Sequence, residues 1–214
     1  MKTALIAGAT GLIGQSLLQI LLKSPKYDKV IALVRRPLNI ENPKLLCLTI
    51  DFDTLSELQT EVQINDVFCC LGTTIKTAGS QEAFTKVDYT YVLKLARWAK
   101  QNASQQFMVV SSVGASSESS NFYLQTKGNM EDAIIKLDLL AFHIFRPSLL
   151  LGQRNEFRFG EKVSEKLMLL FNPMMKGKLR KYKAIKASDV AKAMYNKAQM
   201  DLRGNIVYEG AEIK

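Results

Sequence analysis

The sequence has few of the residues on which metal centres and nucleophilic triads depend. Its 214 residues include one histidine and three cysteines. His143 lies inside the apolar run LAFHIFRP, where a core position is expected, and Cys47, Cys69 and Cys70 lie in predicted buried strands without metal-ligand spacing. This argues against a metal site, zinc above all, and against a Ser-His-Asp triad. Cysteines without a disulfide framework favour a reducing compartment, so a cytoplasmic protein is expected.

Long apolar runs and an export signal are also lacking. Apolar residues make up 47% of the chain and charged residues 23%, as in an average soluble protein. No apolar run approaches the roughly 18 residues that a membrane span needs. The first residues, MKTALIAGATG, lead directly into glycines without a small-residue cleavage site. We expect a soluble protein with no membrane span, whose residues 1–214 form one domain.

Positive charge is concentrated near the C-terminus. The net charge is +9, and residues 171–214 hold 10 basic and 4 acidic residues, most densely in MMKGKLRKYKAIK. Such a stretch suits nucleic acid or an acidic protein surface, but no nucleic-acid-binding motif accompanies it. The favoured interpretation is a solvated basic face near an anionic cofactor or substrate. A protein partner is the alternative, and nucleic acid is the least favoured.

Short β-branched strands alternate with helical segments over residues 1–150. Strands in which every position is apolar are buried on both faces, as in a parallel sheet covered by helices. The pattern predicts an α/β fold with a doubly wound parallel sheet. The predicted helices are 12–23, 54–62, 81–101 and 122–137.

After Pro147 the alternation loosens. The sequence predicts a Met-rich helix at 161–171, then the basic stretch, a helix capped by Ser188 or Asp189, and a last strand in GNIVYEG. Residues from about 148 to 214 are too few for a second domain of typical size. We expect them to form a small C-terminal cap on the substrate side.

Three glycines follow the first predicted strand. The stretch IAGATGLIG places Gly8, Gly11 and Gly14 between that strand and the helix 12–23. Glycines there let the backbone turn tightly and approach a pyrophosphate, whose charge the N-terminal amides and dipole of the helix stabilise. The strand-turn-helix context, more than the glycines themselves, predicts a dinucleotide site.

The end of the second predicted strand indicates which dinucleotide binds. An NAD site normally has an acidic residue there, about 20 residues after the loop, which accepts hydrogen bonds from the ribose 2′-hydroxyl. Here the chain reads ALVRRP, with Arg35 and Arg36 in that place. Two fixed cations suit a 2′-phosphate through charge-assisted contacts. The sequence therefore predicts NADP(H) rather than NAD as the cofactor.

Two further strand ends are predicted to border the nucleotide. Asp51 follows the third strand and either accepts from the adenine amino group or caps the helix that begins in DFDT. Leu71, Gly72 and Thr73, in CLGTT, follow the fourth strand. Because ligands bind at the carboxyl ends of strands in such folds, these three residues are expected beneath the riboses.

Two tyrosine-lysine pairs have the spacing of four that places both side chains on one helix face. They are Tyr123 with Lys127 and Tyr182 with Lys186. Only the first pair follows a strand that ends in serines and belongs to the half of the fold with the glycine loop. A lysine ammonium about 4 Å from a phenolic oxygen, at an effective dielectric near 20, stabilises the phenolate by on the order of 4 kcal/mol. Tyr123 is therefore the predicted proton donor or acceptor.

Ser111 and Ser112 end the fifth predicted strand. We expect the Ser112 hydroxyl to bind the substrate carbonyl oxygen and to stabilise the charge that develops there. Ser111 is the alternative. Lys127 is expected to bind the nicotinamide ribose hydroxyls as well, which makes Ser112, Tyr123 and Lys127 the predicted catalytic set.

At these residues the sequence resembles the short-chain dehydrogenase/reductase superfamily. The stretches GATGLIG, VRRP, CLGTT, the strand-end SS and YLQTK occur in the right order across residues 1–150. More closely, FCCLGTT, VDYTYVLKLA and SSNFYLQTKG look like the atypical short members related to the oxidoreductase-like Tat-interacting protein. The resemblance implies an NAD(P)-binding Rossmann fold and NADPH as the cofactor.

The resemblance also implies particular cofactor contacts. These are Thr10, Gly11, Leu12 and Ile13 at the phosphates, Arg35 and Arg36 at the 2′-phosphate, Leu71 and Gly72 along the cofactor, and Leu150 and Arg158 beyond the sixth strand. In one departure, Asp88 stands where many superfamily members have an asparagine of a proton relay. In another, the interval from Ser112 to Tyr123 is shorter than in many members, which keeps Ser111 as a candidate.

The predicted function is an NADP(H)-dependent oxidoreductase that moves a hydride to or from a carbonyl or alcohol carbon of a small-molecule substrate. One alternative is an epimerase or dehydratase that uses the same residues and recycles the cofactor. The other is a regulatory protein that binds NADPH without turnover and binds a partner through the basic stretch. Helices 81–101 and 122–137 are where related folds often pair into homodimers.

Overall fold

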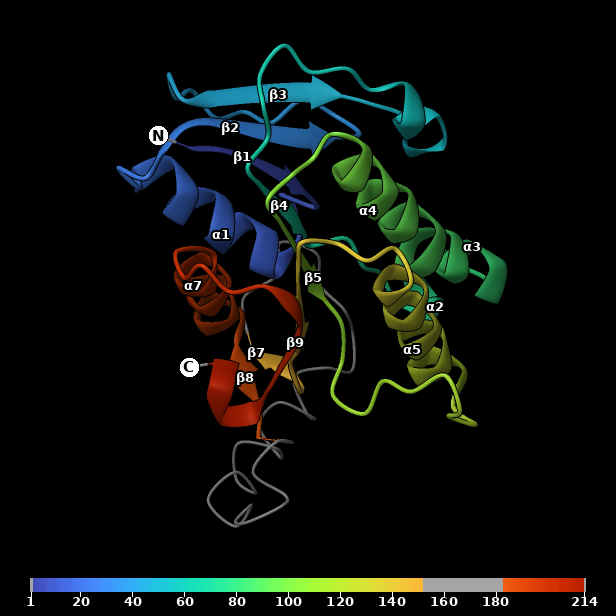
Figure 1. Ribbon diagram of the computed structural model, residues 1–214. Helices are drawn as coiled ribbons and strands as arrows, with labels where there is room; N and C mark the ends of the chain where they lie inside the picture. Colours follow the sequence, from blue (N-terminus) through green and yellow to red (C-terminus); the bar gives the residue numbers. More distant parts are fainter. Residues whose placement is uncertain (1, 152–182, 214) are drawn as a thin grey trace.

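Seven parallel strands form one sheet in the computed structural model, which describes residues 2–151 and 183–213 (Figure 1). The spatial order is β3-β2-β1-β4-β5-β6-β9, so the direction of winding reverses between β1 and β4. This confirms the predicted doubly wound fold. The strands are β1 (Lys2–Ala7), β2 (Tyr27–Val34), β3 (Leu45–Thr49), β4 (Asp66–Cys69), β5 (Gln106–Val110), β6 (Ala141–Arg146) and β9 (Gly204–Glu209).

Helices cover both faces of this sheet. In Figure 1, α1 and α7 lie on one side of the strands, and α4 and α5 lie on the other. Alternate strand residues point to opposite faces and so build two separate apolar cores. Phe68 and Met108 belong to the core under α1 and α7, whereas Val67 and Phe107 belong to the core under α4 and α5. The four helices are α1 (Leu12–Lys23), α4 (Tyr91–Gln101), α5 (Phe122–Ile135) and α7 (Ala187–Ala198).

Two predicted helices differ from the observed ones. The predicted helix 54–62 is a short 3-10 helix, η1 (Phe52–Glu57), because Thr54 departs from helical backbone angles. The predicted helix 81–101 consists of α3 (Gln81–Thr85), a π-helical turn η2 (Lys86–Thr90) and then α4, after a short α2 (Ile75–Ala78). A π turn holds one residue more than an α turn, so it shifts the face on which the following side chains lie.

The predicted cap of the last helix is wrong. α7 begins at Ala187, and its N-cap is Lys186, without a side-chain hydrogen bond. Ser188 and Asp189 therefore lie inside the first turn. Asp189 still stabilises the helix there, because its negative charge interacts favourably with the positive N-terminal end of the helix dipole.

β3 corrects the expectation that every strand is buried on both faces. Among the described strands it lies at the edge of the sheet, next to β2, and the side chain of Leu46 is 43% exposed. Cys47 on the same strand is only partly buried. Cys69, on the central β4, is completely buried, and this burial raises the pKa of its thiol to about 12.

Part of the segment after Pro147 completes the main sheet. β9 pairs with β6, and α7 packs against α1. β7 (Leu150–Leu151) and β8 (Ile185–Lys186) form a separate parallel pair, and η5 (Gly210–Ile213) follows β9. The predicted helix 161–171 and most of the basic stretch lie outside the described residues. Among the helices that the structure describes, none is long and apolar enough to span a membrane.

His143 is a core residue, as predicted. It is completely buried on β6, its ring stacks on the ring of Tyr208, and its Nδ1 lies 2.9 Å from the Tyr208 hydroxyl oxygen. Burial, assisted by the positive charge of Lys197, lowers the pKa of His143 to about 4. The imidazole is therefore neutral at physiological pH.

This neutral histidine should make stability depend on pH. The unfolded chain binds a proton at this residue near pH 6.5, and the folded chain binds it only near pH 4. The contribution of His143 is complete above about pH 6.5, and the free energy of unfolding should fall by roughly 3 kcal/mol as the pH drops to about 4. Urea unfolding at a series of pH values measures this slope. The double variant His143→Phe/Tyr208→Phe has an aromatic ring at each position but no titrating imidazole. Its free energy of unfolding should therefore lose the part of the pH dependence that comes from His143, and an unchanged pH dependence would contradict this role of His143.

Candidate functional site

The glycine loop follows β1 and lies against the backbone of the residues that follow β4. Gly8 has a positive φ of 84°, and a methyl group on it would lie 2.4 Å from the carbonyl oxygen of Cys70. A methyl group on Gly14 would lie 2.0 Å from the carbonyl oxygen of Gly8. Both positions therefore require glycine. Gly11 is less restricted, since its nearest such contact is 3.4 Å.

The N-terminus of α1 is open to a ligand. Gly11 is its N-cap and offers no side-chain hydrogen bond to the first amides, and the first turn has no acidic residue. Thr10 and Gly11 are exposed, Leu12 is half-buried and Ile13 is buried. Ile13 can therefore contact a phosphate only through its backbone. Free amides at a helix N-terminus, in a loop too tight for side chains, fit the pyrophosphate of a dinucleotide.

Arg35 and Arg36 are both exposed directly after β2. Neither forms an ion pair with a described residue. Both guanidinium groups are thus available to an anionic ligand. Asp51, at the end of β3, caps η1, where its carboxylate accepts a hydrogen bond from the Asp53 amide at 2.8 Å. Of the two roles considered for Asp51, the structure shows the capping role.

Residues 71–73 continue from β4 past the glycine loop. The Leu71 amide lies within 2.8 Å of the position that a methyl group on Gly8 would take. Leu71 packs against the core under α4 and α5, and Gly72 is exposed. The Thr73 amide donates a hydrogen bond to Asp88 at 2.8 Å. Residues 71–73 therefore connect the glycine loop to Asp88 and to the core under α4 and α5.

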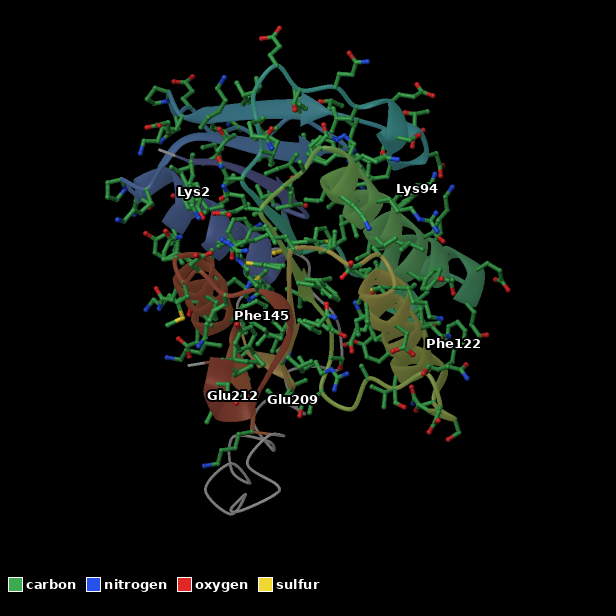
Figure 2. The ribbon with its side chains drawn as sticks, viewed as in Figure 1. Lys2, Lys94, Phe122, Phe145, Glu209 and Glu212 are labelled. Atoms are coloured by element: carbon green, nitrogen blue, oxygen red, sulfur yellow. The ribbon has the colours of Figure 1, made fainter. Side chains whose placement is uncertain are left out.

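Tyr123 and Lys127 lie in the first two turns of α5, which begins beside the labelled Phe122 in Figure 2. The Tyr123 ring is half-buried against Phe84, with ring centroids 5.6 Å apart. Lys127 is buried, and its ammonium lies 2.8 Å from Oδ1 of Asp88 and 3.4 Å from the Val110 carbonyl oxygen. The lysine therefore extends toward the end of β5, as a site at this sheet edge requires.

Lys127 is not the isolated cation that the spacing alone suggested. Burial is the largest influence and by itself lowers the pKa of the ammonium, but the Asp88 carboxylate, the Tyr123 phenol and the Cys69 thiol together outweigh it, and the pKa is raised. Lys127 is thus protonated, and its charge is balanced by Asp88. Its stabilisation of a phenolate at Tyr123 is therefore weaker than that of a lone ammonium.

The two serines at the end of β5 differ in their partners. The buried Ser111 donates a hydrogen bond to Glu131 of α5, and Glu131 in turn accepts from Nε of Arg146 at 3.1 Å. Ser112 is half-buried, and its hydroxyl makes only a long contact, 3.4 Å, to the Val113 carbonyl oxygen. Ser112 is therefore the serine whose hydroxyl is available to a substrate.

The network around Arg146 was not anticipated from the sequence. Arg146 ends β6 and also pairs with Glu209 at 3.0 Å, so it joins α5, β6 and β9; Figure 2 labels Glu209. The only signal was an arginine that follows an apolar strand, directly before Pro147. No periodicity indicates that Glu131 lies opposite it, because the two residues meet through the packing of α5 on the sheet.

The remaining predicted residues lie elsewhere. Leu150 is half-buried in β7 and packs against the core under α1 and α7. Arg158 and Tyr182 lie outside the described residues, whereas Lys186 is exposed at the start of α7. Within residues 2–151 and 183–213, no cluster of histidine, cysteine or acidic side chains could hold a metal ion.

A family model described as NAD(P)H-binding matches residues 8–199. The chain belongs to this NAD(P)H-binding family. It is 39% identical over 169 residues to Protein HTATIP2 of Rattus norvegicus, covering 77% of this chain and 69% of that protein. It is 34% identical over 208 residues to Protein FMP52, mitochondrial, of Candida albicans, covering 94% and 90%. These matches confirm the relation to the atypical short-chain dehydrogenase/reductases close to HTATIP2.

Solved structures of other proteins share this fold. MoeE5 in complex with UDP-glucose and NAD superposes with a TM-score of 0.71 and 17% identity, covering 99% of this chain and 79% of that one. The UDP-N-acetylglucosamine 4-epimerase from Methanobrevibacter ruminantium M1 gives 0.73 and 18%, covering 97% and 76%. At such low identity the likeness establishes the fold alone.

The glycines of this loop can be tested individually. Gly8→Ala combines a positive φ with a clash against the Cys70 carbonyl, and we expect it to lower the free energy of unfolding by at least about 2 kcal/mol. Gly11→Ala is the matched control and should cost less than about 1 kcal/mol, since its methyl group has room. Urea unfolding without nucleotide measures both. Equal losses would show that the approach of β1 to β4 is not the restricting contact.

Proposed function

We propose that this protein is an NADP(H)-dependent oxidoreductase that acts on a carbonyl or alcohol group of a small-molecule substrate. One observation carries the proposal: a continuous series of contacts joins the dinucleotide loop to the tyrosine-lysine pair. It runs from Gly8 to residues 71–73, from the Thr73 amide to Asp88, and from Asp88 to Lys127. A cofactor bound along residues 71–73 would therefore end beside Tyr123 and Lys127, the pair for which the sequence predicts proton transfer.

Arg35 and Arg36 support NADP(H) rather than NAD. They are exposed, free of carboxylate partners among the described residues, and located at the end of β2, where the adenosine ribose of a dinucleotide lies in such folds. Two guanidinium groups attract a 2′-phosphate through charge-assisted hydrogen bonds. Without an acid at this place, nothing selects for a 2′-hydroxyl.

Each residue of the reactive set has a distinct role in this proposal. When bound, the nicotinamide supplies or accepts the hydride. Tyr123 transfers the proton to or from the substrate oxygen, and Ser112 holds that oxygen with its available hydroxyl. Lys127 donates to the nicotinamide ribose from its buried position. Tyr123 is half-buried, and the contact of its ring with Phe84 positions it for this role.

Two alternatives have distinct signatures. An epimerase or dehydratase that recycles the cofactor would convert its substrate without net NADPH consumption. A regulatory protein would bind NADPH and show no turnover with any carbonyl or alcohol, and its partner would be sought on the basic stretch, most of which lies outside the described residues.

A cytoplasmic location stays a prediction. The name of the FMP52 relative includes "mitochondrial", so the mitochondrion is the alternative that microscopy of a tagged protein would test.

Calorimetric titration with NADPH and NADH tests the cofactor. The wild type should bind NADPH more tightly than NADH, and Arg35→Ala and Arg36→Ala should each weaken NADPH binding by about tenfold to a hundredfold, the value of one charged hydrogen bond. NADH binding should change little. Arg203→Ala, an exposed arginine just before β9, is the matched control. Equal affinity for both nucleotides in all variants would overturn the NADP(H) assignment.

Turnover tests the proton donor. In a screen of carbonyl substrates with NADPH, Tyr123→Phe should lower kcat by about a hundredfold or more and leave NADPH affinity nearly unchanged. Tyr195→Phe is the control: its hydroxyl contacts Ser24, 2.8 Å away, between the end of α1 and α7. Undiminished turnover in Tyr123→Phe would exclude the proposed chemistry.

A further inference from the structure

Asp88 makes two contacts that join the cofactor segment to the reactive helix. Its Oδ2 accepts a hydrogen bond from the Thr73 amide at 2.8 Å, and its Oδ1 lies 2.8 Å from the Lys127 ammonium. The Asp88 side chain is 1% exposed and that of Lys127 is 4% exposed. Because both groups are withdrawn from water, solvent does not screen these contacts as it would on the surface.

Asp88 faces the interior from within a π turn. Asp88 is the central residue of η2, whose i→i+5 hydrogen bonds accommodate one more residue than an α turn. Lys86, at the start of the same turn, is exposed and pairs with Asp53 at 2.7 Å. The turn thus presents a lysine outward and an acid inward within three residues. π turns of this kind often occur at functional sites.

The contact with Lys127 is ionic rather than an aligned hydrogen bond. The two atoms are close, yet Oδ1 of Asp88 has no partner within hydrogen-bond geometry among the described residues. Lys127 also donates to the Val110 carbonyl at 3.4 Å. An ammonium has three N–H donors, and the Val110 carbonyl takes one of them, so Lys127 keeps donors for a ligand beside it. The carboxylate holds the lysine by charge and leaves it a donor.

Three titratable groups face Lys127 from the surrounding elements. They are Asp88 from η2, Tyr123 from α5 and Cys69 from β4. Cys69 is a neutral thiol, since burial raises its pKa to about 12. Asp88 supplies the carboxylate that opposes the cost of burying the ammonium. Removing that carboxylate would leave a buried, unbalanced charge, and the proton of Lys127 would be released more easily.

We propose that Asp88 is a positioning residue that holds the Lys127 ammonium and the Thr73 amide in a fixed relation, so that one buried carboxylate sets both the cofactor segment and the reactive pair. The catalytic part of this inference rests on the proposed oxidoreductase function; the contacts themselves do not. An asparagine at this position could still accept from the Thr73 amide, but it could not balance the charge of Lys127. Balancing the charge of Lys127 therefore requires a carboxylate at position 88.

Asp88→Asn and Asp88→Ala separate the two contacts. The asparagine variant keeps an acceptor for Thr73 and removes the charge, whereas the alanine variant removes both. The protonation of Lys127 can be followed by the 13Cε chemical shift in lysine-labelled protein, without nucleotide, with the signal assigned through Lys127→Arg. Asp53→Asn, which removes the carboxylate of the exposed pair with Lys86, is the matched control.

In the wild type and in Asp53→Asn, Lys127 should stay protonated beyond the ordinary lysine pKa of about 10.4. In Asp88→Asn its midpoint should fall at least about one pH unit below that value, a tenfold loss of proton affinity. Asp88→Ala should weaken NADPH binding at least about tenfold more than Asp88→Asn does, because it also frees the Thr73 amide. A Lys127 midpoint in Asp88→Asn equal to that of the wild type would overturn the inference.

A measurement on the wild type covers the case in which neither variant folds. The Thr73 amide should exchange its hydrogen at least about a hundredfold more slowly than in an unstructured peptide, because it is bonded to a buried carboxylate. If the Thr73 amide exchanged as fast as in an unstructured peptide, the proposed hold of Asp88 on this amide would be overturned. Failure of NADPH binding or of turnover in the wild type would instead overturn the proposed function and would leave both spectroscopic results as they stand.

Discussion

Parallel pairing of all seven strands is the constraint on which the rest of this structure depends. Parallel neighbours need a crossover between them, so every strand of this sheet ends at the same edge, and α1 and α5 begin there after β1 and β5. The glycine loop and the pair Tyr123 and Lys127 are more than a hundred residues apart in the chain, yet both belong to this edge. In folds of this kind ligands bind where the strand order reverses, which here is between β1 and β4. The close approach of Gly8 to the Cys70 carbonyl lies at that reversal, so the glycine loop and the segment after β4 meet there.

Charge is treated differently in the two parts of this edge. At the nucleotide part, the exposed Arg35 and Arg36 and the free amides of α1 face solvent, where they can attract a polyanion over several ångströms. At the reactive part, Lys127 is buried, and its charge is matched by Asp88. A lone ammonium in the interior would cost more than its attraction to a substrate returns. The exposed arginines can therefore attract an anionic ligand from solution. The charge of Lys127, beside the proposed proton transfer, is instead balanced by Asp88.

Satisfied hydrogen bonds determine which of several similar residues can act. Ser111 and Ser112 are adjacent, directly after β5, but only Ser111 reaches Glu131, whereas Ser112 makes one long contact of 3.4 Å to the Val113 carbonyl. In the same way the single histidine is held by Tyr208 inside the core and is neutral there. The side chains left with an available group, Ser112 and Tyr123, are the ones to which the proposed function assigns the substrate.

Local patterns in the sequence determined the strand and helix order, the glycine loop, the two arginines after β2 and the pair on α5, because each depends on backbone period or on spacing within one segment. The tertiary structure alone decided the rest. An edge position exposes β3, although its composition is that of a buried strand. Asp88 is buried within η2, and a π turn breaks the period of 3.6 on which helix prediction relies, so its inward position could not be inferred from spacing. Ser112 rather than Ser111 is free, and Lys127 is paired rather than isolated, because those outcomes depend on contacts between segments that are brought together only when the helices pack on the sheet.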